Sequence, residues 1–239
     1  MPGFTSMLPM SRTLRAVAAL SLLALVVSGC SKKDDPTPTT SASTLPNGAA
    51  LLTEAAVAMA TVKTAHFALT VDGDIENLAI SKAEGDLTRE GNAKGTATLT
   101  QSGLKVETEF VIVGQDAYLK GPTGGFTKVP LSFAATVYDP SAILDPTRGV
   151  ANLLKAAKNP QTVGQEGNAY KVTFEPDATA LAAVIPTKIT GITAAVWVDA
   201  STKQVTKGAF TVPASGGKPG GTITVVFSNF DAPVTVSAP

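Results

Sequence analysis

Apolar and polar residues alternate with a period of two over much of residues 65–129, which predicts antiparallel β-strands. The clearest strand covers residues 104–113, where every second residue is apolar or uncharged and the residues between are mostly charged. Its apolar positions are Leu104, Val106, Phe110 and Ile112. An Asp-Gly-Asp turn at residues 72–74 and later glycines separate the strands at hairpin-like intervals. The pattern predicts a meander with one apolar and one hydrated face.

A helical period appears in three places. Residues 49–62 are rich in alanine and carry an apolar stripe at helical spacing, which is more typical of core than of a partner-binding face. Residues 139–160 interrupt the meander with a second helix, for which Asp145 is the expected N-cap. Its apolar stripe comprises Val150, Leu153, Leu154 and Ala157. Asp139-Pro140 can start a shorter turn before it, and residues 177–185 predict a third helix.

Strands resume after the second helix, and these later strands carry apolar residues on both faces. They are expected at residues 169–175, 189–198, 203–212, 222–230 and 233–236. Val196 lies opposite Trp197 in one strand, and Val225 lies opposite Val226 in another. A sheet that is apolar on both faces must be covered on both, or must line an apolar space.

The N-terminus has the pattern of an export signal. Arg12 and Arg15 precede an uncharged run at residues 16–27 that is too short to cross a bilayer as a helix. The sequence Leu-Val-Val-Ser-Gly-Cys then ends at Cys30 and resembles a bacterial lipobox, in which the thiol is lipidated and cleavage precedes the cysteine. The alternative is an ordinary secretory signal with a chance cysteine.

These features predict three segments. Residues 1–29 are the lipoprotein signal peptide, and residues 30–48 are the lipidated cysteine and a flexible tether rich in Pro, Ser and Thr. Residues 49–239 form one α+β domain. No later apolar run of about 18 residues predicts a membrane span.

Charge and cysteine content narrow the class of protein. Without residues 1–29, 17 basic and 19 acidic residues remain, which gives a net charge of 17 − 19 = −2. This balance, without a basic cluster, does not favour nucleic acid as a partner. Cys30 is the only cysteine, so no disulfide framework is available.

The residues that catalysis requires are scarce. His66 is the only histidine, and no serine stands in a G-x-S-x-G motif. Asp72, Asp74 and Glu76 could bind Ca²⁺ weakly, but a hairpin turn explains them better. The glycine-rich residues 216–221 lack the Lys-Ser/Thr pair of a P-loop. We therefore expect no enzyme activity, no metal site and no cofactor.

Three stretches, taken in this order with the lipobox and tether, resemble one family. They are residues 62–66 (Val-Lys-Thr-Ala-His), 145–154 (Asp-Pro-Thr-Arg-Gly-Val-Ala-Asn-Leu-Leu) and 195–199 (Ala-Val-Trp-Val-Asp). The order is similar to that of the actinobacterial LppX/LprA/LprF/LprG lipoproteins. The resemblance covers most of residues 30–239.

The resemblance implies a curved antiparallel sheet, a half-barrel with helices on its concave side around an apolar cavity. It implies a carrier that binds the acyl chains of lipids or glycolipids and moves them across the cell envelope. The carrier would be anchored through Cys30 to the outer face of the cytoplasmic membrane, sometimes beside a lipid-exporting transporter. The residues expected at the cavity are Val106, Phe110, Ile112, Val150, Leu153, Leu154, Val196 and Val225. The alternative is a surface-tethered structural or adhesion domain with a solid core and no lipid ligand.

Overall fold

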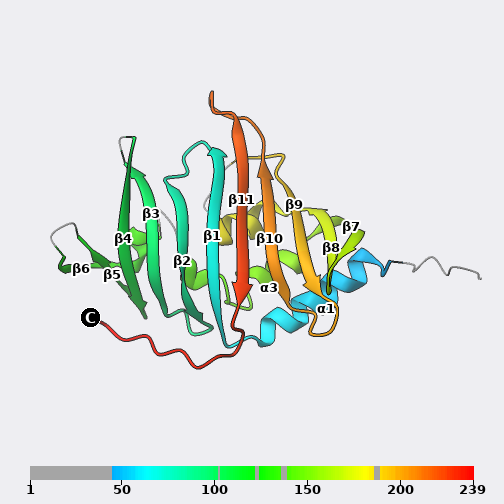
Figure 1. The fold of residues 1–239 in the computed structure, drawn as a ribbon, viewed down its shortest axis with the longest axis horizontal. Coiled ribbons are helices and arrows are strands. Elements are labelled where there is room, and N and C mark those ends of the chain that lie inside the picture. The colour runs from blue at the N-terminus through cyan, green and yellow to red at the C-terminus, as the bar shows by residue number, and fades with distance from the viewer. Residues whose placement is uncertain (1–44, 102, 122–123, 136–138, 186–188) are drawn as a thin grey trace, which may run out of the picture. The chain divides into compact units, whose positions relative to one another are not determined.

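Residues 45–239 are described by a computed structural model, apart from residues 102, 122–123, 136–138 and 186–188 (Figure 1). Eleven strands of these residues form one antiparallel sheet in the order β6-β5-β4-β3-β2-β1-β11-β10-β9-β8-β7. The strands are β1 (Thr64–Asp74), β2 (Ile80–Thr88), β3 (Ala93–Gln101), β4 (Leu104–Val113), β5 (Asp116–Lys120), β6 (Phe126–Pro130), β7 (Lys158–Glu166), β8 (Ala169–Glu175), β9 (Thr193–Asp199), β10 (Val205–Val212) and β11 (Gly220–Ser228). Because β6 and β7 do not pair with each other, the sheet stays open and is not a closed barrel.

Two meanders make up this sheet, and they join where the first strand pairs with the last. Strands β1–β6 follow one another in space, as do β7–β11, and β1 pairs with β11 in the middle. Phe67 of β1 lies opposite Phe227 of β11, and both side chains are buried. The joint therefore places apolar residues from the two ends of the chain in one core.

The helices pack on one face of the sheet, which we call the inner face (Figure 1). They are α1 (Gly48–Thr61), α2 (Leu131–Ala134), the 3₁₀ helix η1 (Pro140–Ala142), α3 (Val150–Lys155) and α4 (Ala178–Val184). The Asn47 side chain caps α1 by accepting a hydrogen bond from the Ala50 N–H at 3.0 Å. The buried stripe of α1 packs against α3 and β7, so α1 belongs to the core as predicted.

The expected fold class, an open antiparallel sheet with helices on its concave side, is confirmed. Helix α4 also confirms its prediction, because the Asp177 carboxylate accepts hydrogen bonds from the N–H groups of Thr179 and Ala180. Asp139 likewise caps η1 through the Ser141 N–H at 3.0 Å.

The outer face of the later strands stays in contact with solvent, although the sequence predicted apolar residues on both faces. Val226 is 43% exposed on this face. Trp197 is buried because the lysines of the neighbouring strands lie over its ring, with Lys207 Nζ 4.2 Å and Lys171 Nζ 4.9 Å from the ring centroid. Long lysine side chains therefore cover apolar surface here in place of a second layer.

Four local predictions were wrong. Residues 72–74 are not the first hairpin turn, because they lie within β1 and pair with residues 220–222 of β11, and the chain turns only at residues 76–77. Asp145 is not the N-cap of α3, because that helix begins only at Val150 after Gly149. Strand β7 was not predicted, and its mostly exposed positions and two register shifts explain why no apolar alternation marks it. Residues 233–236 form no strand: Asn229 and Asp231 have positive φ values and turn the chain away after β11.

None of the helices in the described part of the chain is long and apolar enough to span a membrane. The predicted signal peptide, Cys30 and most of the predicted tether lie outside the described residues.

Candidate functional site

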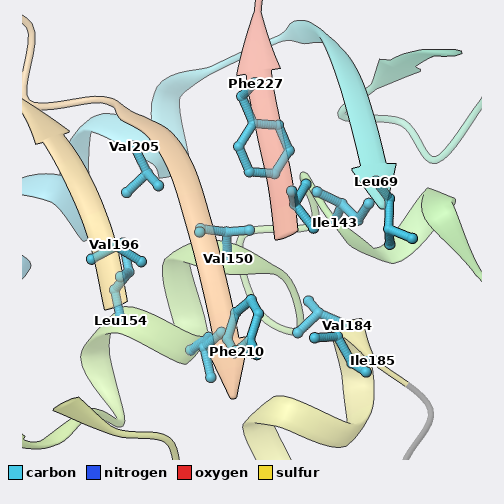
Figure 2. Close-up of a pocket in the computed structure, with 13 residues that line it drawn as sticks. Leu69, Ile143, Val150, Leu154, Val184, Ile185, Val196, Val205, Phe210 and Phe227 are labelled. Carbon is cyan, nitrogen blue, oxygen red and sulfur yellow. The ribbon is translucent and has the colours of Figure 1, made fainter. Parts of the chain in front are cut away.

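Two apolar pockets lie between the helices and the inner face of the sheet. The first, which we call the α3 pocket, has a volume of about 30 Å³ (Figure 2). It is lined by Leu69, Ile143, Val150, Leu153, Leu154, Val184, Ile185, Val196, Val205, Gly208, Phe210, Val225 and Phe227. The second, the α2 pocket, has a volume of about 140 Å³. It is lined by Ile80, Ala97, Leu99, Thr108, Phe110, Ile112, Ala117, Leu119, Phe133, Ala134 and Pro140.

Side chains of α3 and of the facing strands meet in the α3 pocket. Figure 2 shows Val150 and Leu154 beneath β9 and β10, with Phe210 and Phe227 projecting from β10 and β11. Val150 lies at the first position of α3, so its place is set by the turn that precedes the helix. These large side chains leave room for about one water molecule.

The turn before α3 is held by Asp145. Its carboxylate accepts hydrogen bonds from the N–H groups of Thr147 (2.8 Å) and Arg148 (3.1 Å), from the Thr147 hydroxyl and from Arg148 Nε. Partial burial opposes ionisation, but these hydrogen bonds outweigh it and lower the pKa of Asp145 to about 2.

Gly149 closes the same turn. Its N–H donates to the Asp145 carbonyl, and a Cβ at this position would overlap the carbonyl oxygens of Ile143 and Ala142. The Val150 N–H then donates to the Ile143 carbonyl at 2.9 Å. Asp145 therefore stabilises the turn that brings Ile143 and Val150 to the same pocket.

Small side chains create the α2 pocket. Ala97 of β3 and Ala117 of β5 face inward among larger apolar residues, and α2 reaches over them with only four residues. The Thr108 hydroxyl donates to the Lys120 carbonyl at 2.8 Å, so this polar atom is satisfied at the pocket wall. Phe133 of α2 lines the pocket while 67% of its surface remains exposed.

The segment around η1 lies between the two pockets. Pro140 lines the α2 pocket and Ile143, three residues later, lines the α3 pocket. The same short segment therefore contributes a wall to each pocket.

Comparison with known proteins identifies the family. The profile of the LppX_LprAFG lipoproteins matches residues 47–236. The chain belongs to the LppX_LprAFG lipoprotein family. Two relatives are the "Lipoarabinomannan carrier protein LprG" of Mycolicibacterium smegmatis and that of Mycolicibacterium hassiacum. The first is 39% identical over 155 residues, which is 62% of each chain and so less than two thirds of that relative. The second is 31% identical over 96% of this chain and 99% of the relative.

Two solved structures share the fold. The crystal structure of LprF from Mycobacterium bovis matches with a TM-score of 0.68 and 22% identity, over 80% of this chain and 96% of that chain. The crystal structure of lipoprotein LppX from Mycobacterium tuberculosis matches with a TM-score of 0.58 and 21% identity, over 79% of this chain and 98% of that chain. At these identities, the likeness is evidence of fold alone.

The family resemblance had suggested eight cavity residues, and the structure divides them between the two pockets. Five line the α3 pocket: Val150, Leu153, Leu154, Val196 and Val225. Phe110 and Ile112 line the α2 pocket. Val106 lies on the same face of β4 but lines neither pocket, and it is 38% exposed because it lies beyond the reach of the helical cover. Cys30, the expected lipid-attachment residue, lies outside the described residues.

Several lining residues were not expected from the sequence. Ile143 follows the η1 turn, where no periodic pattern assigns it to a face. Ala97 and Ala117 contribute by being small, and alanine carries no pattern that separates a hollow from a tightly packed core. The one sequence feature that could have indicated Ala97 and Ala117 as lining residues was their inward position on predicted strands.

The two linings determine which ligands the pockets can bind. No described residue that lines either pocket carries a charge, and no group of three or more potential metal ligands occurs among the described residues. An ion or a strongly polar molecule would lose its hydration there without a replacement. The pockets therefore suit hydrocarbon.

Proposed function

We propose that this protein is a non-enzymatic lipid carrier that binds the acyl chains of a lipid or glycolipid between its helices and the inner face of its sheet. The observation that supports this most directly is the pair of apolar pockets between the helices and the inner face of the sheet. Family membership supports it as well, since two relatives are named as lipoarabinomannan carrier proteins.

The energetics of lipid transfer fit an enclosed apolar site. A buried CH₂ group is worth about 0.8 kcal/mol, so a chain of about 16 carbons represents roughly 12 kcal/mol of contact with an apolar medium. The bilayer already supplies that contact. A carrier can therefore extract a lipid only if its own interior replaces nearly all of it.

The volumes imply that the cover moves when lipid binds. The α2 pocket, at about 140 Å³, is similar in size to an engineered cavity of about 150 Å³ that binds benzene. It can hold only part of a long chain, and the α3 pocket holds less. The contacts of α3 and α4 with the sheet are mainly apolar, and one ion pair joins Asp177, the N-cap of α4, to Lys158 of β7 at 3.2 Å. Mainly apolar contacts therefore oppose the displacement of these helices.

The proposed location follows from the N-terminal sequence. Processing before Cys30 and lipidation of its thiol would anchor the protein to the outer face of the cytoplasmic membrane. A flexible tether at residues 31–47 would span roughly 20–25 Å on average, which lifts the domain just clear of the headgroups. Carriage across the cell envelope would then place a lipid-exporting membrane transporter among its partners.

Lipid extraction tests the proposed function. Residues 31–239 are to be produced in a lipid-rich actinobacterial host, and an organic extract of the purified protein is to be examined by mass spectrometry. We expect close to one acylated lipid per protein. A lipid-free extract from folded protein would favour the structural or adhesion alternative.

The anchor is tested separately with Cys30→Ala. We expect an uncleaved precursor that incorporates no labelled fatty acid, because the thiolate is the nucleophile for lipidation. Metabolic labelling and the size of the product report both effects. Label retained on the variant would refute the lipobox assignment.

A further inference from the structure

A shallow groove crosses the outer face of β8, β9 and β10, on the opposite side of the sheet from the two apolar pockets. Its volume is about 450 Å³, which lies in the range of small-molecule sites. Cross-strand register arranges its side chains in rows. Lys171, Trp197 and Lys207 form one end, and Ala195 and Ala209 form a small-residue floor beside Thr173. Thr193 and Thr211 form the other end.

Trp197 is held rigidly at its end of the groove. Its indole N–H donates to Glu166 Oε2 at 2.7 Å, and the ammonium groups of Lys171 and Lys207 lie over its ring. Lys171 also pairs with Glu166 at 3.6 Å. The ring is fixed on several sides and is only 9% exposed, so it forms a rigid wall of the groove that does not rearrange when a ligand binds beside it.

Hydroxyl and amide groups at the groove are available to a ligand. Within the described residues, the side chains of Asn159, Thr193 and Thr211 have no hydrogen-bond partner, and all three are exposed. Each of these groups can both donate and accept a hydrogen bond. That property matches an alcohol better than it matches a purely accepting anion.

The charges at the groove cancel. Among the lining residues Lys171 contributes +1 and Glu175 contributes −1, and the two charged groups that contact Trp197 from outside the lining, Lys207 and Glu166, also cancel. Phosphate sites need an excess of positive charge, and acidic peptides need the same. A neutral polar ligand is therefore the class that these residues favour.

We propose that this groove, called the Trp197 groove from here on, binds a neutral sugar residue. The CH groups of the sugar ring would pack on Ala195 and Ala209, beside the lysine-covered Trp197, while its hydroxyls pair with Asn159, Thr193 and Thr211. The inference rests on the proposed function only for the source of the sugar, which would be the glycan of a bound glycolipid. The acyl chains and the glycan would then occupy opposite faces of one sheet.

Fluorescence tests this site directly, because Trp197 is the only tryptophan in the chain. The full-length protein, in a detergent without a sugar headgroup, is to be titrated with acyl-free oligosaccharides of mannose and of arabinose. We expect a saturable change in emission with at least one of them. Inorganic phosphate at the same ionic strength is expected to give none.

A double variant, Thr193→Ala with Thr211→Ala, removes two hydroxyls without touching the apolar pockets. We expect sugar affinity to fall about 30-fold, since two hydrogen bonds of about 1 kcal/mol each are lost. Thr70→Ala, an exposed threonine on the outer face of β1, is the matched control and should leave the affinity unchanged. Ala209→Leu, which fills the floor, should abolish binding.

The outcomes separate this inference from the proposed function. No response to either sugar, an equal response in the double variant, or a response to phosphate alone would overturn the sugar site. Acylated lipid is to be extracted in parallel from residues 31–239 without substitutions. Sugar binding without any recovered lipid would support the sugar site and refute the proposed lipid-carrier function. Recovered lipid without sugar binding would support the carrier function and refute the sugar site.

Discussion

The α3 pocket and the α2 pocket lie against the same face of one sheet, yet the second is several times larger. Phenylalanines from β10 and β11 fill the sheet side of the α3 pocket, whereas Ala97 and Ala117 occupy comparable inward positions at the α2 pocket. The periodicity of the strands is the same in both regions. The difference shows that the size of the inward residues, and not the apolar pattern, determines where a hollow forms.

The cover differs as well. Helices α3 and α4 and the turn held by Asp145 close the α3 pocket, and α1 packs behind α3. The α2 pocket is covered by four helical residues and the η1 segment, and Phe133 remains largely exposed. We infer that the α2 pocket can accept part of an acyl chain without rearrangement of the protein, while the α3 pocket can do so only when the helices that cover it move.

The largest effect is expected from Leu153→Ala in the α3 pocket. Leu153 is 2% exposed, and removing a buried leucine side chain costs about 2–5 kcal/mol of unfolding free energy. The matched variant in the other region is Leu119→Ala, where the side chain is only partly buried beside an existing hollow. We expect a clearly smaller loss there. Urea unfolding measures the free energy of unfolding of both variants. Equal losses in Leu153→Ala and Leu119→Ala would contradict the proposed difference between the two pockets.

The difference between the two pockets in size and in helical cover could not be predicted from the sequence, although the strands that line both pockets could be. Alternation located β1 to β4 and the β9–β10 hairpin because one side of each strand is buried. Along β4 the same apolar face changes from 3% exposed at Ile112 and 6% at Phe110 to 38% at Val106. Periodicity assigns these three residues to one face, but it contains no information on where a helix stops covering that face.

The helix N-caps could also be predicted only in part from the sequence. Asp145 has the hydrogen-bonding role expected of a cap, but it serves a single turn, because Gly149 separates that turn from α3. Asp177 fulfils its prediction because α4 follows it without interruption. The residues that accept capping hydrogen bonds could therefore be recognised from the sequence. Whether a long helix or only a single turn follows each cap depended on contacts with residues distant in sequence.

A smaller effect is expected at Asp145, and it depends on pH. The pKa of Asp145 in the folded protein is about 2, below its ordinary value of 3.8, so ionised Asp145 stabilises the fold. This contribution is complete above about pH 5 and is lost as the pH falls through 4 towards 2. Asp145→Asn should therefore reduce stability at pH 7 by on the order of 1–2 kcal/mol.

The difference in stability between wild type and Asp145→Asn, followed from pH 7 to pH 2, isolates this group from the other acids. We expect the difference to shrink steadily below pH 4. Hydrogen exchange should show the loosening at α3 and not at α2, because Asp145 holds only the turn that leads to α3. A difference that does not vary with pH would mean that Asp145 acts by some means other than its charge.

The smallest effect on stability is expected from filling the α2 pocket with Ala97→Phe. In a close-packed core such a change would cost about 1–3 kcal/mol by overpacking. Ala97 borders a hollow of about 140 Å³, so the ring can enter it with little displacement of its neighbours. The acyl chain would lose that volume, and lipid recovered per protein should fall. Thr98→Phe is the control, since it adds the same ring to the same strand on the outer face.

Thermal unfolding and lipid extraction on one sample of Ala97→Phe distinguish the possibilities. A large loss of stability would mean that the hollow does not admit the ring, whereas unchanged stability with unchanged lipid would place the chain elsewhere and make the α3 pocket the primary site.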